Sequence, residues 1–257
     1  MASKILKMML YCLGATSMAL TGCGTNAQLA KSTVPVRVNR TTAGNHRLMV
    51  MAVADGAPVR FVSHKEANFG GAPSINDNGI VLNVAAAFTL DTSSMDVCGD
   101  HVVAGQHLAG YDDVTATGHM LVVNNKVSIL PNSCLQESLR AAADGKGYLF
   151  QQCLIVEDGK GMVERIPQAI RDRKAHIIYR AACLINDGSL AIVQGDEPMY
   201  CNEFIDALVA LGAQQALYLD MGTWAWGWVR DGSTTIELAE RFNNTRYQSN
   251  WLQVTQR

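Results

Sequence analysis

Arg180 and Asp220 each stand at the edge of a strongly apolar run, where an isolated charge is costly. Arg180 lies within Ile177–Ala182, and Asp220 follows Ala216–Leu219 directly. A guanidinium in such a run either pairs with a nearby acid or offers its planar fork to a phosphate or carboxylate. A carboxylate at the end of a buried strand either caps an Asx-type turn or acts in catalysis. The residues alone leave both alternatives open for each group.

Aromatic and amide side chains suited to a sugar ligand occur in three further segments. Trp224, Trp226 and Trp228 alternate with small residues, so on a strand they share one face, either as core packing or as a stacking platform. Asn83 and Gln152 lie in or beside apolar runs, where a side-chain amide needs hydrogen-bond partners and a ligand can supply them. The six histidines have no metal-ligand spacing and no C-x-x-C pair occurs, so we expect neither a metal nor a cofactor.

The segments around these candidates resemble the phosphodiester glycosidase family, the relatives of the mannose 6-phosphate uncovering enzyme. The matching segments are Arg180-Ala-Ala-Cys-Leu, Asp187-Gly188, Glu203-Phe204, Leu211-Gly212-Ala213 and Leu219-Asp220-Met221-Gly222. A bacterial lipoprotein branch is similar also in its Trp-rich stretch, in Arg230-Asp231 and in Asn250-Trp251. The similarity extends over about residues 148–257 and is thinner over about 75–125.

The resemblance implies a hydrolase that splits the bond between an anomeric carbon and a phosphodiester oxygen. Because phosphate is already a good leaving group, one carboxylate and one arginine can suffice, whereas ordinary glycosidases use two carboxylates. The implied catalytic residues are Asp220 and Arg180. The implied substrate-binding residues are Asn83, Gln152, Trp224, Trp226, Arg230 and Asp231. Glu203 or Asp231 is a candidate second acid, although a glutamate there also suits a helix N-terminus.

The sequence departs from the family pattern where glycines follow the asparagine and the aspartate. Val84, Ala85 and Met221 stand at those positions, and side chains there can narrow or reshape a pocket. A non-catalytic carbohydrate-binding lipoprotein of the same fold is therefore the alternative to an enzyme. A cysteine hydrolase using Cys153 or Cys183 is a third possibility, but the sequence shows no electropositive setting for either thiol.

The elements that position these residues are predicted from turn chemistry and periodicity. Hairpins are expected around Asn124-Asn125, Asp158-Gly159 and Asn186-Asp187-Gly188, and further strands over Val34–Val38, Leu48–Val53 and Ile80–Val84. Helices are expected over Leu135–Ala143, Asn202–Leu211 and Thr235–Phe242, with Gly212 ending the second. Hairpins mixed with helices, without a βαβ rhythm, predict an α+β fold: a mixed, largely antiparallel sheet packed by a few helices.

The N-terminus carries an export pattern. Lys4 and Lys7 precede the apolar stretch Met8–Leu20, and Leu20-Thr21-Gly22-Cys23 resembles the lipobox of bacterial lipoproteins. This predicts a signal peptide over 1–22, acylation of Cys23, a tether over 23–33 and one domain over 34–257. Gly24 implies the outer membrane by that resemblance. A buried N-terminal helix with a chance cysteine, or an unlipidated secreted protein, are the alternatives.

The amino-acid composition and charge limit which classes of partner the protein can bind. The chain has 257 residues, 48% of them hydrophobic, which excludes a disordered protein. Lys+Arg and Asp+Glu number 21 and 23 and form no basic run, so nucleic acid is excluded as a partner. We expect a carbohydrate or sugar-phosphate ligand and a membrane contact through the lipid anchor. Beyond Cys12 and Cys23 five cysteines remain, an odd number that leaves at least one free.

Overall fold

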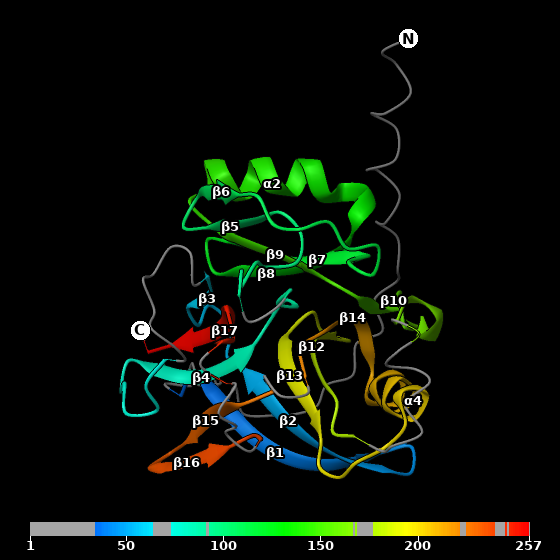
Figure 1. Cartoon of the computed structure of the whole chain (residues 1–257). Helices are drawn as coiled ribbons and strands as arrows, with labels where there is room; N and C mark the ends of the chain where they lie inside the picture. The colour runs from blue at the N-terminus through cyan, green and yellow to red at the C-terminus, as the bar shows by residue number, and fades with distance from the viewer. Residues whose placement is uncertain are drawn as a thin grey trace, which may run out of the picture. The chain divides into compact units, whose positions relative to one another are not determined.

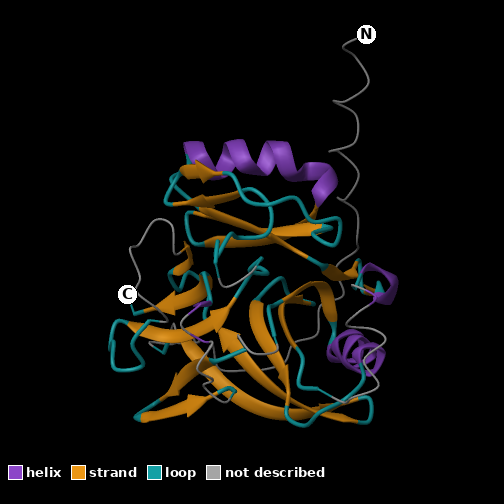
Figure 2. Ribbon diagram, viewed as in Figure 1, coloured by secondary structure: helices purple, strands orange, loops and turns teal. Residues whose placement is uncertain are grey.

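The computed structural model describes residues 34–63, 73–90, 93–166, 168, 177–221, 225–239, 245 and 247–256. All of these belong to one compact unit, Thr33–Arg257. This unit contains three antiparallel sheets and, in its described part, two α-helices (Figures 1 and 2). The predicted signal peptide, Cys23 and the tether lie outside the described residues, and so does Trp224.

The largest sheet has seven strands in the order β1-β2-β13-β12-β14-β10-β11. Its strands are β1 Val36–Ala43, β2 His46–Val53, β10 Leu154–Glu157, β11 Lys160–Gly161, β12 Arg180–Ile185, β13 Leu190–Gly195 and β14 Ala213–Tyr218. Helix α4, Cys201–Leu211, packs on one face through Phe204 and Leu208 (Figure 1). Glu203 accepts a hydrogen bond from the Tyr200 N–H at 2.8 Å and so caps this helix.

The second sheet has five strands in the order β16-β15-β4-β17-β3. Its strands are β3 Val59–Ser63, β4 Ile80–Ala85, β15 Gly227–Asp231, β16 Thr234–Glu237 and β17 Asn250–Thr255. The central strand β4 pairs with β15 on one side and β17 on the other. One face carries Trp226, Trp228 and Trp251 packed around Ala85. The opposite face contributes Leu82 and Val84 to the main core.

The third sheet has the order β6-β5-β9-β7-β8. Its strands are β5 His101–Val103, β6 Gln106–Leu108, β7 Gly118–Val123, β8 Lys126–Pro131 and β9 Tyr148–Gln152. Helix α2, Leu135–Asp144, covers one face, where Leu139 and Ala142 pack on Val102 and Leu149 (Figure 2). Short 3-10 turns lie at Asn132–Cys134 and Val163–Arg165. The main core joins all three sheets, since Met51, Leu82 and Phe150 belong to one cluster.

The predicted hairpins and the first two predicted helices are confirmed. Asn124 and Asn125 both have positive φ between β7 and β8, and Gly212 has φ 96° after α4. The predicted helix over Thr235–Phe242 is wrong in its described part, because Thr234–Glu237 forms β16. The β-branched residues there pair with β15 across a turn at Gly232. The fold is predominantly β, which is broadly consistent with the predicted α+β class.

Candidate catalytic site

Arg180 begins β12 and is completely buried. Its Nε and Nη2 atoms donate to Gln194 Oε1 at 2.8 and 2.6 Å, and its Nη1 donates to the carbonyl of Ala225 at 2.9 Å. Desolvation lowers the pKa of Arg180 to about 9, so the group is still charged at neutral pH. Its three side-chain hydrogen bonds all go to neutral acceptors, and no carboxylate among the described residues pairs with it. Of the two alternatives for Arg180, the structural ion pair with an acid is therefore not what holds this arginine.

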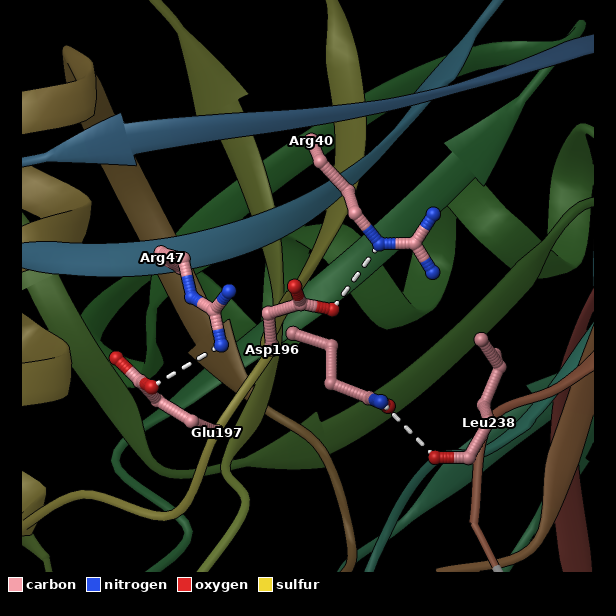
Figure 3. A network of polar contacts seen from close by, with 6 residues as sticks. Arg40, Arg47, Asp196, Glu197 and Leu238 are labelled. Carbon is pink, nitrogen blue, oxygen red and sulfur yellow. Dashed lines mark hydrogen bonds and ion pairs between the residues drawn. The ribbon is translucent and has the colours of Figure 1, made fainter.

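Gln194 is a site residue that the sequence analysis missed. It ends the apolar run of β13 and lies directly opposite Arg180 in the sheet. Its Nε2 donates to the carbonyl of Leu238 at 2.9 Å (Figure 3), which leaves its oxygen for the guanidinium. The signal was available, since an amide closing an apolar run is the same pattern that singled out Gln152. On the surface nearby, Arg40–Asp196 and Arg47–Glu197 ion pairs tie the end of β13 to β1 and β2 (Figure 3).

Asp220 lies two residues beyond β14 and is 4% exposed. Its carboxylate accepts hydrogen bonds from the main-chain N–H groups of Met221 and Thr89. Its Oδ2 atom is buried and has no partner among the described residues. Desolvation raises the pKa of Asp220 to about 8. Asp220 is thus a buried carboxyl that accepts two main-chain hydrogen bonds but whose Oδ2 atom has no partner among the described residues.

Arg180 and Asp220 come together through the main chain. The Leu219 N–H donates to the Arg180 carbonyl at 3.0 Å, and Ala181 lies opposite Tyr218 in the sheet. Their charged groups nevertheless have separate partners: no ion pair joins them in the described part, and neither charge contributes to the pKa shift of the other. The structure therefore offers one buried cation and one buried carboxyl at neighbouring strand ends, with neither neutralising the other.

The segment after β4 connects the site to all three sheets. The Ala86 carbonyl accepts from the Asp220 N–H at 2.9 Å, and Gln152 Nε2 at the end of β9 lies 3.5 Å from the same oxygen. The Asn250 side chain accepts from the Ala87 N–H at 2.7 Å and donates to the Ala87 carbonyl at 3.1 Å. Thr89 Oγ1 bonds Ser249 Oγ at 2.9 Å. Gln152 and Asp220 are therefore brought to one point of the backbone.

Asn83 occupies the centre of β4 and is completely buried. It lies opposite Trp228 on β15 and opposite Gln253 on β17. Its Oδ1 accepts from Gln253 Nε2 at 2.8 Å, and its Nδ2 has no partner among the described residues. The two residues that follow Asn83 are used in packing: Val84 lies in the main core and Ala85 lies among the tryptophans.

Trp226 is 1% exposed and packs against Trp228 and Trp251, with ring centroids 5.0 and 6.3 Å away. Its Nε1 donates to Glu237 at 2.8 Å. The predicted shared face of Trp226 and Trp228 is confirmed, and both rings pack there in one cluster with Trp251.

Arg230 lies at the far end of β15 from Ala225. It donates to the carbonyls of Ile75, Asp77 and Ile80 and to Thr235 Oγ1. Because β4 runs from Ile80 towards Ala86, these partners lie at the opposite end of β4 from Asp220. Asp231 is exposed at the end of the same strand. The structure therefore does not bring Arg230 and Asp231 to Asp220.

Cys98, Tyr111 and Asp113 form a second group of titratable side chains, and the first two are close enough to Asp220 to be affected by its charge. Tyr111 donates a hydrogen bond to the Cys98 sulfur, and the backbones of the two residues form an isolated parallel β-bridge. Burial, with the nearby charge of Asp113, raises the pKa of Cys98 to about 12 and raises that of Tyr111 as well, and the charge of Asp220 adds to both shifts. Tyr111 and Asp113 are partly exposed, whereas Asp220 is not. No sequence motif marked this group.

Other features of the described part lie away from the site. A cavity of about 570 Å³ lies between hairpin tips and is lined by residues such as Asp55, Lys126 and Asp187, with none of the predicted site residues. In the described ranges no three His, Cys, Asp or Glu side chains are arranged to hold a metal. No helix within those ranges is long and apolar enough to cross a bilayer.

Comparison with known proteins gives a structural relationship only. No protein-family model matches the chain. No curated protein matches it in sequence. Among solved structures, the zebrafish N-acetylglucosamine-1-phosphodiester α-N-acetylglucosaminidase catalytic domain, auto-inhibited by its pro-peptide, aligns with TM-score 0.57 at 11% identity, over 86% of this chain and 82% of that one. A hypothetical protein from Synechocystis aligns with TM-score 0.51 at 13% identity, over 86% of this chain and 62% of that one. The chain shares the fold of these proteins at a distant level.

Proposed function

We propose that this protein is a glycan-active hydrolase that cleaves a sugar-1-phosphodiester or a related glycosidic bond at the cell envelope. One observation carries the proposal: Arg180 is a completely buried cation whose side-chain hydrogen bonds, in the described part of the chain, go to neutral groups. A buried charge without a counter-charge is costly, and an anionic ligand removes that cost. The negative charge of a phosphate complements the positive charge of the guanidinium, and its oxygens can accept from the planar set of guanidinium donors.

Asp220 supplies the second group that this reaction needs. In its ionised form it accepts a proton from the attacking water, whose oxygen bonds to the anomeric carbon. The bond from that carbon to the phosphodiester oxygen breaks, and the phosphate leaves with the electron pair. A base works best when its pKa is near the working pH, and burial raises the pKa of Asp220 to about 8. Arg180 stabilises the charge that develops on the leaving phosphate.

Asn83 and Gln152 are the proposed substrate contacts nearest this pair, because both lie on the strands that meet at Ala86. The likeness of the fold to a phosphodiester glycosidase catalytic domain supports the reaction class. The alternative, a non-catalytic carbohydrate-binding lipoprotein, is favoured by Met221, which replaces a glycine directly after Asp220.

The test compares the wild type with Asp220→Asn on a panel of sugar-1-phosphodiesters. We expect release of sugar by the wild type and a fall in rate on the order of 10²-fold or more in Asp220→Asn, with sugar binding nearly intact. Equal background rates for both proteins, with sugar binding still measurable, would support the binding-protein alternative.

For localisation we propose a lipid-anchored protein of the bacterial envelope, with the outer membrane as the destination. The proposal rests on Leu20-Thr21-Gly22-Cys23 and on the charged and apolar segments that precede it. Acylation with more than one chain anchors a protein stably, whereas a single chain does not.

A further inference from the structure

We propose that Asn83, Trp228 and Trp251 form an oxyanion-binding subsite on the tryptophan face of the five-stranded sheet. Each of these side chains is completely buried and carries a nitrogen donor without a partner in the described part: Asn83 Nδ2, Trp228 Nε1 and Trp251 Nε1. A buried donor left without a partner is energetically costly, so three of them on one face of the sheet call for an acceptor.

The orientation of the Asn83 amide is fixed by its neighbours. Arg60 has only donors, and its Nε donates to Gln253 Oε1 at 2.8 Å. Gln253 must therefore present its Nε2 to Asn83, whose Oδ1 accepts at 2.8 Å. This leaves the Asn83 NH₂ group as the free end of the chain of hydrogen bonds. The amide cannot flip to offer an oxygen without breaking the contact with Gln253.

The two indoles can only donate, because the indole N–H has no acceptor function. Trp228 and Trp251 are both unsatisfied at this atom. Trp226, which packs between them, differs because its N–H already donates to Glu237 at 2.8 Å. The tryptophan face thus holds two indoles with a free donor and one whose donor is occupied.

Strand register places the three residues that carry these donors in one patch of the sheet face. Trp228 lies directly opposite Asn83 on β15, and Trp251 lies opposite Ala85, two residues further along β4. Side chains at alternate positions and at directly opposed positions share a face of the sheet. The patch adjoins the candidate catalytic site, since Ala225, which accepts from Arg180, directly precedes Trp226.

A patch made only of donors selects a ligand that presents only acceptors. A sugar hydroxyl bound to this patch would leave its own hydrogen without an acceptor. The ionised oxygens of a phosphate ester only accept hydrogen bonds, so they leave no donor unpaired. The choice of phosphate among oxyanions rests on the proposed function. The expected occupant is therefore the phosphoryl group of the substrate, with Trp228 and Trp251 as binding residues that the sequence analysis did not assign.

The test is calorimetric titration of the folded chain with inorganic phosphate, with acetate and chloride as separate arms at equal ionic strength. We expect saturable binding of phosphate and none of chloride, and the acetate arm separates a carboxylate site from a phosphate site. Trp228→Phe and Trp251→Phe each keep a ring and remove one N–H, and each should weaken phosphate binding roughly tenfold or more. Tyr148→Phe, on β9 of the third sheet, also keeps a ring and removes one polar hydrogen; it is the control and should change the affinity less than about threefold.

Near-UV circular dichroism establishes that each variant keeps the fold. The inference is overturned if the wild type shows no saturable heat with phosphate, which would mean that buried water alone satisfies the donors, or if the Trp228→Phe and Trp251→Phe variants bind like the wild type. Tighter binding of acetate than of phosphate overturns the phosphate assignment. Phosphate binding without hydrolysis of any phosphodiester leaves this inference standing and removes the proposed function, and hydrolysis without phosphate binding does the reverse.

Discussion

Two atoms of Arg180, Nε and Nη2, donate to a single oxygen of Gln194 at 2.8 and 2.6 Å. The glutamine cannot turn away, because its own nitrogen donates to the Leu238 carbonyl at 2.9 Å. A neutral amide thus fixes the position of the cation without cancelling its charge. That arrangement differs from a structural salt bridge, where removing the charge would be the purpose of the contact.

Arg180→Lys keeps the positive charge and loses the planar fork. We expect a higher KM for phosphodiesters than in the wild type, with a smaller effect on neutral glycosides, because only the former use the charge and the fork together. Steady-state kinetics on both substrate types measures the difference. An equal rise in KM for both would show that Arg180 does not contact the phosphate.

The pH dependence of kcat/KM tests the role of Asp220 as a base. Because burial raises its pKa to about 8, the ionised form becomes more abundant as the pH rises towards that value. We therefore expect kcat/KM to increase up to about pH 8 and to fall at higher pH, where Arg180, with a pKa of about 9, loses its charge. A profile that falls over the same range would assign Asp220 as a general acid instead.

The same carboxyl affects stability. In the unfolded chain an aspartate has a pKa of about 3.9, so the folded chain binds more protons between about pH 4 and pH 8. The free energy of unfolding should therefore fall as the pH rises through this window. Asp220→Asn should remove this part of the pH dependence and stabilise the protein at pH 8 by on the order of 1–3 kcal/mol, or about 2–4 °C in Tm per kcal/mol.

Thermal melts of the wild type and the variant across that range measure the effect. Asp206→Asn, on the exposed side of α4, is the matched control and should leave the pH dependence unchanged. Parallel pH profiles for the wild type and Asp220→Asn would contradict the raised pKa.

Gly212 ends α4 with φ 96°, and a Cβ atom there would collide with the side-chain amide of Asn186. Gly212→Ala should lower the free energy of unfolding by about 1–2 kcal/mol, mainly from the left-handed backbone, because the exposed Asn186 side chain can move aside at the cost of its hydrogen bond with Gln214. Gly188→Ala, with φ 81° and open space around it, isolates the backbone cost and should lose only about 1 kcal/mol. Equal losses in urea unfolding would show that the collision is relieved at no cost.

Cys23→Ala tests the lipid anchor. We expect it to abolish labelling with a radioactive or clickable fatty acid and to leave the precursor uncleaved at this position, because the thiol is the acylated group in the lipobox pattern. Unchanged labelling would remove the lipoprotein proposal, whereas cleavage without labelling in the wild type would indicate an unlipidated secreted protein.

Local signals predicted the hairpins and helices of this fold well. Asn124-Asn125 and Gly212 demand particular backbone angles, and the structure has them. The error at Thr235–Phe242 arose where a short apolar periodicity competed with β-branched residues and a nearby turn, and pairing with β15 decided the outcome. Three separate sheets, rather than one, follow from long-range pairings that no local pattern encodes.

The candidate site was predictable only in part. Arg180, Asp220 and Asn83 could be identified from the sequence because each is a polar residue in or beside an apolar run, and all three are buried. The sequence did not indicate the hydrogen-bond network around these residues, because Gln194, Leu238 and Gln253 come from distant segments of the chain. Arg230 and Asp231 were carried over from the resemblance, and the structure gives Arg230 partners at the other end of β4.

The central position of β4 in its sheet has a consequence for how the chain folds. Both neighbours of this strand, β15 and β17, follow far later in the chain, and Asn83 and its partner Gln253 are 170 positions apart. Until those late strands pair, β4 exposes two open edges, which invite pairing with other chains, and closure over such separations is slow. Asn83 acquires its orientation only when β17 pairs with β4, so a chain without this pairing lacks the proposed subsite.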